Sequence, residues 1–222
     1  MIGMPRKPRI DIGGYICHIT ARGNNKEQIF YEKDDYRTYL ESVKRAKQKI
    51  PFTLFAYVLM PNHVHLLLKP KNDGDVAKIM QIIQTKYTVY FNWRHKRCGH
   101  LFQGRFKSII IEEEPHLLEL SRYIHLNPVR ASLVHNCSDY PYSSYQFYLQ
   151  GDGKNLIDTD EILSHFGKRK EIQIAKFRGF VEKNRKRKTY NPALYLKEDV
   201  FLGSDKFKDR ILNSHFTRLG GV

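Results

Sequence analysis

The sequence has few cysteines, no long apolar segment and a shortage of acidic residues. Its three cysteines among 222 residues, Cys17, Cys98 and Cys137, are widely separated, which argues against a disulfide framework and against a cysteine-rich zinc site. The longest uncharged apolar run, Leu54–Met60, is far shorter than the roughly 18 residues that cross a bilayer. The basic stretch Met1–Ile10 is not followed by the apolar segment of a signal peptide. We therefore expect a soluble, cytoplasmic protein with no membrane partner.

What the sequence does have is a strong excess of basic charge. It contains 38 Lys and Arg against 23 Asp and Glu, a formal net charge of +15. The excess is 22 − 13 = +9 up to Gln150 and 16 − 10 = +6 beyond it, so it is spread along the chain. Hydrophobic residues at 41% and aromatic residues at 13% suffice for a packed core and exclude general disorder. This profile is typical of a globular protein that meets a polyanion, most often nucleic acid.

The order of the predicted elements is typical of an α+β fold. Apolar patterns and Gly, Pro and Asn breaks predict strand, helix, strand, strand, helix, strand and then a further helix. These cover Tyr15–Arg22, 34–50, Phe52–Met60, His63–Lys69, 75–91, Arg105–Ile111 and 114–127. A βαββαβ order is ferredoxin-like or RRM-like, an antiparallel sheet with two helices on one face and the other face free for a ligand.

A break at Gly151–Gly153 separates two predicted parts of the chain. Residues 1–150 form the ferredoxin-like domain with its additional helix. Residues 151–222 form a basic, helical extension, in which Asp158 and Glu161 resemble a capping box and Lys183–Lys188 form a basic run.

The most informative stretch follows the predicted hairpin turn at Pro61–Asn62. Side chains alternate along a strand, so His63 and His65 point to the same face, about 7 Å apart. Two imidazoles in this arrangement can hold one divalent metal ion. They can equally be two histidines on an exposed polar face with no chemical role.

A second group of residues lies near the end of the last predicted helix. Tyr123 and Asn127 are four residues apart and therefore share one side of that helix. The pair could offer a phenol nucleophile and a third metal ligand. Alternatively, Tyr123 is a buried core residue and Asn127 is the helix end before Pro128, which is expected to close the helix.

Taken together, these stretches resemble a known family. The His63–His65 strand, the segment Phe102–Phe106 and the helix end Tyr123–Ala131 resemble the single-tyrosine HUH transposases, in the REP-associated tyrosine transposase branch of the IS200-like superfamily. The stretches Cys17–Asn24 and Asp139–Tyr145 fit the same pattern, and the resemblance covers about Pro5 to Tyr148 in matching order.

The resemblance implies a function and a set of roles. Such proteins nick and rejoin single-stranded DNA near hairpins by attack of a tyrosine on a phosphodiester, which leaves a 5′-phosphotyrosine and a free 3′-OH. Carried over by position, Tyr123 is the nucleophile, and His63, His65 and Asn127 bind Mg²⁺ or Mn²⁺. A phenol with a pKa of about 10 is a poor nucleophile at pH 7. A divalent ion on the scissile phosphate assists the attack, because it withdraws charge from the phosphate.

Candidate DNA contacts and the rival functions complete the prediction. Arg22, Arg105, Lys107 and Arg122 are candidate phosphate partners, although each could be a solvated surface charge.

Two other functions rival that of a transposase. One rival is a non-catalytic RRM-like module that binds nucleic acid. The other is a metal-dependent phosphodiesterase that uses water as its nucleophile. The expected partner is single-stranded or hairpin DNA, and the sequence leaves monomer and homodimer both open.

Overall fold

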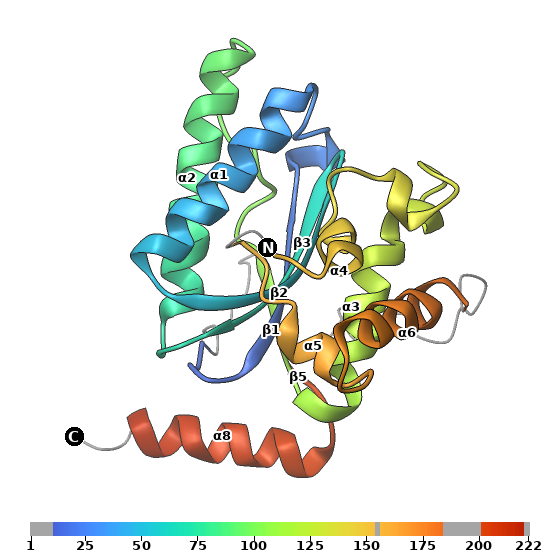
Figure 1. Cartoon of the computed structure of the whole chain (residues 1–222). Coiled ribbons are helices and arrows are strands. Elements are labelled where there is room, and N and C mark those ends of the chain that lie inside the picture. Colours follow the sequence, from blue (N-terminus) through green and yellow to red (C-terminus); the bar gives the residue numbers. More distant parts are fainter. Residues whose placement is uncertain (1–10, 154–155, 184–200, 220–222) are drawn as a thin grey trace.

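The core of the molecule is a five-stranded sheet with the strand order β2-β3-β1-β4-β5 (Figure 1). The computed structural model describes residues 11–153, 156–183 and 201–219. Its strands are β1 (Ile16–Arg22), β2 (Phe52–Met60), β3 (His63–Pro70), β4 (Lys107–Ile111) and β5 (Phe201–Leu202). β1 runs antiparallel to both β3 and β4, and β2 runs antiparallel to β3. The first four strands thus have the ferredoxin-like topology that the sequence predicts.

The fifth strand was not predicted from the sequence. β5 has only two residues and pairs with β4 in parallel, with Ile110 opposite Phe201. The sheet is therefore mixed, and the helical extension expected after residue 151 returns part of the chain to the sheet. A two-residue strand carries too short a pattern to be recognised, because its apolar character is compatible with any secondary structure.

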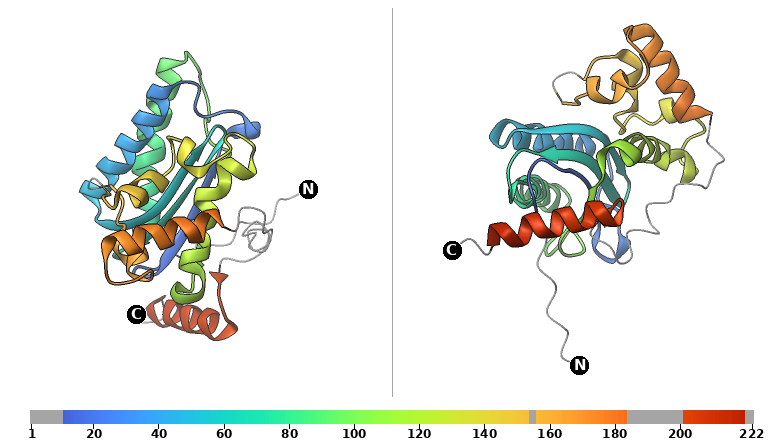
Figure 2. Two further views of the ribbon diagram at one scale, coloured as in Figure 1. Left: turned by 45° about the vertical axis from the view of Figure 1, so that its right-hand side comes forward. Right: turned by 90° about the horizontal axis from the view of Figure 1, so that it is seen from below.

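Two long helices cover one face of the sheet. α1 (Lys33–Lys49) and α2 (Asp75–Arg94) lie side by side on that face (Figures 1 and 2). Their buried residues lie on the sides that face the sheet, among them Tyr39 and Val43 of α1 and Ile83 and Tyr87 of α2. α1 begins at Lys33, one residue before the predicted start. Glu32 caps it, and the Asp35 carboxylate accepts from the Glu32 backbone N–H at 3.1 Å.

The other face of the sheet, which a βαββαβ arrangement alone leaves free, is covered by the additional helix that the sequence predicts after the last strand. α3 (Glu113–Arg130) packs there against β2 and β3, with Leu120 and Ile124 fully buried (Figure 2). Pro128 does not close this helix, contrary to the sequence-based expectation. Proline at that position removes the single hydrogen bond to the Ile124 carbonyl, but the Ala131 N–H still donates to Asn127 O at 2.9 Å, so the helix continues to Arg130.

The segments after α3 pack on the rest of the molecule. They are η2 (Cys137–Asp139), α4 (Tyr145–Gln150), α5 (Asp160–Ser164), α6 (Lys170–Glu182) and α8 (Asp205–Leu219). A further short helix, η1 (Asn24–Lys26), lies earlier in the chain and follows β1. α6 contacts α3 and α4. The Phe207 ring of α8 lies 6.0 Å from that of Tyr15. Of the predicted basic run, only Lys183 is among the described residues.

Asp158 has a different role from the predicted helix cap. Its Oδ2 accepts from the Leu54 backbone N–H of β2 at 2.7 Å and pairs with Lys47 Nζ of α1 at 2.5 Å. Its own N–H donates to Leu54 O. The helix that follows begins instead after Thr159. Asp158 thereby ties the chain beyond residue 156 to the edge of the sheet.

In the described parts of the chain, none of the helices is both long and apolar enough to cross a bilayer.

Candidate active site

Two adjacent strands place three imidazoles on the sheet face that α3 covers. His63 and His65 lie on β3, and their ring centroids are 5.0 Å apart. The antiparallel register sets Thr20 of β1 opposite His65. His18, two residues earlier on β1, stacks on the His65 ring at a centroid distance of 5.0 Å. Side chains alternate between the two faces along each strand, and the register aligns β1 with β3. Together these two features bring the three imidazoles into one cluster.

The hydrogen bonds of this cluster leave one nitrogen free on each β3 histidine. His65 Nδ1 lies 2.9 Å from His18 Nε2 and 3.3 Å from Thr20 Oγ1, and His63 Nδ1 lies 2.6 Å from Asn62 Oδ1. An amide oxygen only accepts, so His63 carries its hydrogen on Nδ1 and its Nε2 has a lone pair. Within the part of the chain that the structure describes, neither Nε2 has a protein partner. Orientation of the ring through Nδ1 is how proteins prepare a histidine to ligate metal through Nε2.

All three histidines are held in the neutral form. Burial lowers the pKa of His63 to about 4, helped by the charge of Arg22. Burial likewise lowers the pKa of His18 to about 4, and lowers that of His65 well below its ordinary value, with further contributions from His18 and His63. Neutral imidazoles at pH 7 are the form that binds a metal ion.

α3 brings Tyr123 to this cluster. The Tyr123 ring lies edge-on to His65 at a centroid distance of 5.9 Å and to His18 at 6.4 Å. Burial raises the pKa of Tyr123, while the Arg130 charge and a hydrogen bond from Asn127 act to lower it. The sequence-predicted nucleophile and the two predicted metal ligands therefore converge from β3 and α3, although they are about 60 residues apart.

Asn127 lies one turn after Tyr123, as the sequence spacing indicates. Its Nδ2 donates to the Tyr123 carbonyl oxygen at 3.0 Å. This bond uses the nitrogen of the amide and leaves the oxygen, which is the atom that ligates a hard cation.

Arg130 is a residue that the sequence reasoning missed. Its guanidinium carbon lies 5.1 Å from the centroid of the Tyr123 ring. Seven residues is two helical turns, so the spacing from Tyr123 to Arg130 would have revealed this contact. The expectation that Pro128 ends the helix concealed it, because Arg130 then falls outside the helix.

Of the four candidate phosphate partners, Arg22, Arg105 and Lys107 are exposed and Arg122 is buried. Arg22 is exposed at the end of β1, opposite His63 in the register. Arg105 is exposed before β4, which begins at Lys107 rather than at the predicted Arg105. Arg122 does not present a free charge: it is buried, pairs with Glu119 and stacks on Phe180 at 4.7 Å.

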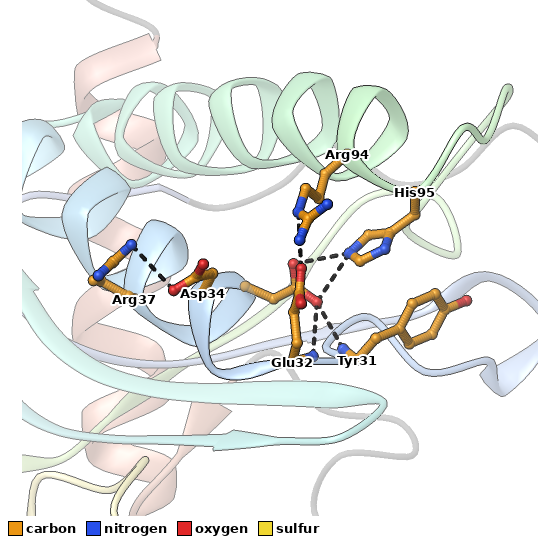
Figure 3. Close-up of polar contacts among 7 residues, drawn as sticks. Tyr31, Glu32, Asp34, Arg37, Arg94 and His95 are labelled. Carbon is orange, nitrogen blue, oxygen red and sulfur yellow. Dashed lines mark hydrogen bonds and ion pairs between the residues drawn. The ribbon is translucent and has the colours of Figure 1, made fainter.

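A second group of ligand-type side chains lies elsewhere, where α1 begins and α2 ends (Figure 3). Among the described residues, it is the one set of three or more His, Cys, Asp or Glu whose ligand atoms lie within 4.8 Å of one another. It comprises Glu32, Asp35 and His95. Asp35 already accepts from the Tyr31 N–H at 2.7 Å and contacts His95 Nε2 at 2.9 Å, and Glu32 pairs with Arg94. These bonds occupy the carboxylates and join the two helices, which accounts for the group without a metal.

Fold and site together place the chain among the DNA transposases. The family described as "Transposase IS200 like" matches residues 12–127, just over half of the chain, a range that includes His18, His63, His65, Tyr123 and Asn127. The chain belongs to this family, whose members are generally DNA-nicking and -joining, metal-dependent enzymes.

Individual relatives agree with the assignment. A protein of Haemophilus influenzae assigned as a REP-associated tyrosine transposase is 28% identical over 143 residues, 60% of this chain and 80% of that protein. The REP-associated tyrosine transposase of Escherichia coli K12 is 26% identical over 125 residues, 55% of this chain and 70% of that protein. A solved REP-associated tyrosine transposase bound to a REP hairpin shares the fold, with a TM-score of 0.58 and 23% identity over 70% of this chain and 89% of that one.

Proposed function

We propose that this transposase nicks and rejoins single-stranded DNA beside a hairpin, with Tyr123 as the nucleophile. Tyr123 Oη forms a bond to phosphorus as the P–O3′ bond breaks, giving a 5′-phosphotyrosine and a free 3′-OH. The phenol proton leaves to solvent and the 3′ oxygen takes one up. Reversal of the same exchange rejoins the strands, because the phosphodiester energy is kept in the covalent link. The relatives' association with REP hairpins supports hairpin DNA as the partner.

The observation that carries the proposal is the 5.9 Å separation of the Tyr123 and His65 rings. No other tyrosine on α3 could serve, since Tyr123 is the single tyrosine between residues 113 and 130. Arg130 and Asn127 favour the phenolate that must form, against the burial that disfavours it. His18 and Thr20 fix the orientation of the His65 ring through its Nδ1.

The donor set fits Mg²⁺ or Mn²⁺. We expect His63 and His65 to bind the ion through Nε2, with Asn127 Oδ1 as the third protein ligand, since these are the atoms that the internal hydrogen bonds leave available. The chemistry that such an ion supplies when bound is withdrawal of charge from the scissile phosphate.

The test is covalent capture of DNA. Wild-type protein is incubated with 3′-labelled hairpin DNA and Mg²⁺ or Mn²⁺ and then run on a denaturing gel, where a protein–DNA adduct is expected. Tyr123→Phe removes one oxygen and little volume, so the fold should survive while both adduct and cleavage disappear. Tyr31→Phe is the matched control, because Tyr31 is 51% exposed and packs against Phe91 and His95 at the end of α2, away from the histidine cluster.

Three results would contradict the proposal in different ways. An adduct formed by Tyr123→Phe would show that another residue is the nucleophile. Cleavage by the wild type with no adduct under any metal condition would favour water as the nucleophile. DNA binding with neither cleavage nor adduct would favour a non-catalytic binding module.

A further inference from the structure

The helical layer on the far side of the sheet carries a basic groove. It has a volume of about 420 Å³ and runs between α1 and α2, which lie side by side in Figure 1. Its lining residues are Arg45 and Lys49 from α1 and Gln81, Ile82, Thr85 and Lys86 from α2. Three cations therefore line the groove, and no carboxylate does.

These cations are not neutralised by the fold. Within the described parts of the chain, Arg45, Lys49 and Lys86 make no ion pair with a carboxylate. Arg45 and Lys49 are one helical turn apart, so their like charges repel each other. Lys49 is at the C-terminus of α1, where the helix dipole favours a cation, but Arg45 and Lys86 are in helix interiors, where that effect is absent. No carboxylate in the groove lining therefore offsets this concentration of charge.

The groove is separate from the candidate active site. α1 and α2 cover one face of the sheet, and α3 lies on the other (Figure 2). There the Tyr123 ring of α3 lies 5.9 Å from that of His65 in the histidine cluster. Groove cations consequently cannot contact the phosphate that Tyr123 attacks. DNA that reaches both places must pass around an edge of the sheet.

We propose that this groove binds the phosphate backbone of DNA flanking the cleaved segment. The inference rests on the proposed function in taking DNA as the polyanion. Arg45, Lys49 and Lys86 neutralise successive phosphates, and the Gln81 amide and Thr85 hydroxyl donate further hydrogen bonds to phosphate oxygens. The side chain of Ile82 offers an apolar floor for the sugars. Such contacts carry no sequence information and would hold flanking DNA of any sequence.

The experiment compares two hairpin probes that differ only in the length of the flank. One has a flank of about 4 nucleotides, and the other has about 20, enough at about 3.4 Å per nucleotide to reach around the sheet. Affinities are measured over a range of salt concentrations for the wild type and for Arg45→Glu/Lys49→Glu/Lys86→Glu. The wild type should bind the long probe more tightly, by about tenfold or more, and the triple variant should lose that advantage. The slope of log affinity against log salt concentration, measured for this variant on the long probe, should be shallower by about 2. This corresponds to about 0.7 for each of three single-strand phosphate contacts.

A matched variant separates the groove from overall charge. Lys168→Glu/Lys176→Glu/Arg178→Glu changes the net charge by the same amount at exposed positions around α6. It should keep the advantage of the long flank, and an equal loss in this control would overturn the proposal. So would an unchanged flank advantage in the groove variant, or an equal loss of affinity for both probes.

Failure of the groove and failure of the proposed function give different results. The groove variant should still cleave the short probe at the wild-type rate and form the adduct. Tyr123→Phe should retain the flank advantage while it forms no adduct.

Discussion

Acid should weaken this fold measurably through His125, which anchors the helix that carries Tyr123. The His125 side chain is fully buried, and its Nε2 lies 2.8 Å from Ser144 Oγ. The rings of Tyr148 and Phe177 lie 5.3 and 5.9 Å from its ring. Among the described residues, its Nδ1 has no hydrogen-bond partner. Burial in these surroundings lowers the pKa of His125 to about 3.

The magnitude follows from proton linkage. The unfolded chain binds a proton to this imidazole below its ordinary pKa of about 6.5, whereas the folded chain does so only below about 3. Between these values the unfolded state binds more protons, so the free energy of unfolding falls as the pH falls. Each pH unit between these two pKa values lowers the free energy of unfolding by about 1.36 kcal/mol. The loss is therefore about 2 kcal/mol at pH 5, and it saturates near 5 kcal/mol below pH 3. Typical domains have about 5–15 kcal/mol in total, so the effect is large.

His125→Gln isolates this contribution. Glutamine keeps a donor for Ser144 but does not titrate, and the buried histidines of the active site are common to both proteins and cancel in the difference. Urea unfolding at pH 8 and pH 5 should show the stability difference shifting by about 2 kcal/mol in favour of the variant at pH 5. His100→Gln, at an exposed position, is the control and should give a much smaller shift. A His125→Gln difference that is the same at both pH values would refute the reasoning.

Three further predictions concern other parts of the molecule. A thiol reagent should label Cys98 rapidly, because it is exposed, and should leave Cys17 unlabelled until the protein unfolds, because burial raises the pKa of that thiol to about 12. Replacing both His63 and His65 with alanine should abolish metal-dependent cleavage while retaining most hairpin binding, since phosphate contacts dominate affinity. Asp158→Asn should lower the free energy of unfolding by about 1–3 kcal/mol, because it weakens bonds to both α1 and β2.

The controls for these predictions come from the same chain. Mass spectrometry of labelled peptides identifies the modified cysteine, and rapid labelling of Cys17 in the native protein would contradict its burial. Asn127→Ala should reduce cleavage less than loss of the histidines, because water can replace one neutral ligand, and full cleavage by the double histidine variant in excess metal would rule out that metal site. Asp209→Asn, at an exposed position on α8, should cost less than Asp158→Asn in the same unfolding assay.

Several features could be predicted from the sequence, because they depend only on residues that are close together in it. Alternation along a strand puts His63 and His65 on one face wherever that strand lies in the fold. The 3.6-residue helical repeat likewise brings Asn127 beneath Tyr123. The hairpin at Pro61–Asn62 and the βαββ order follow from turn residues and apolar period, which act over a few positions only. For the same reason the family resemblance could be recognised, since it depends on short motifs in a fixed order.

Tertiary structure decided the rest, because it depends on which distant segments pair. The register between β1 and β3 sets His18 and Thr20 against His65, and no local pattern in either strand specifies that register. Asp158 looked like a helix cap because its sequence neighbours fit one, yet its carboxylate instead satisfies a backbone N–H of β2 more than 100 residues away. α3 continues past Pro128, which places Arg130 over the Tyr123 ring. The sequence by itself therefore determined which candidate side chains share one face of a strand or helix, and packing of α3 onto the second face of the sheet determined that they meet.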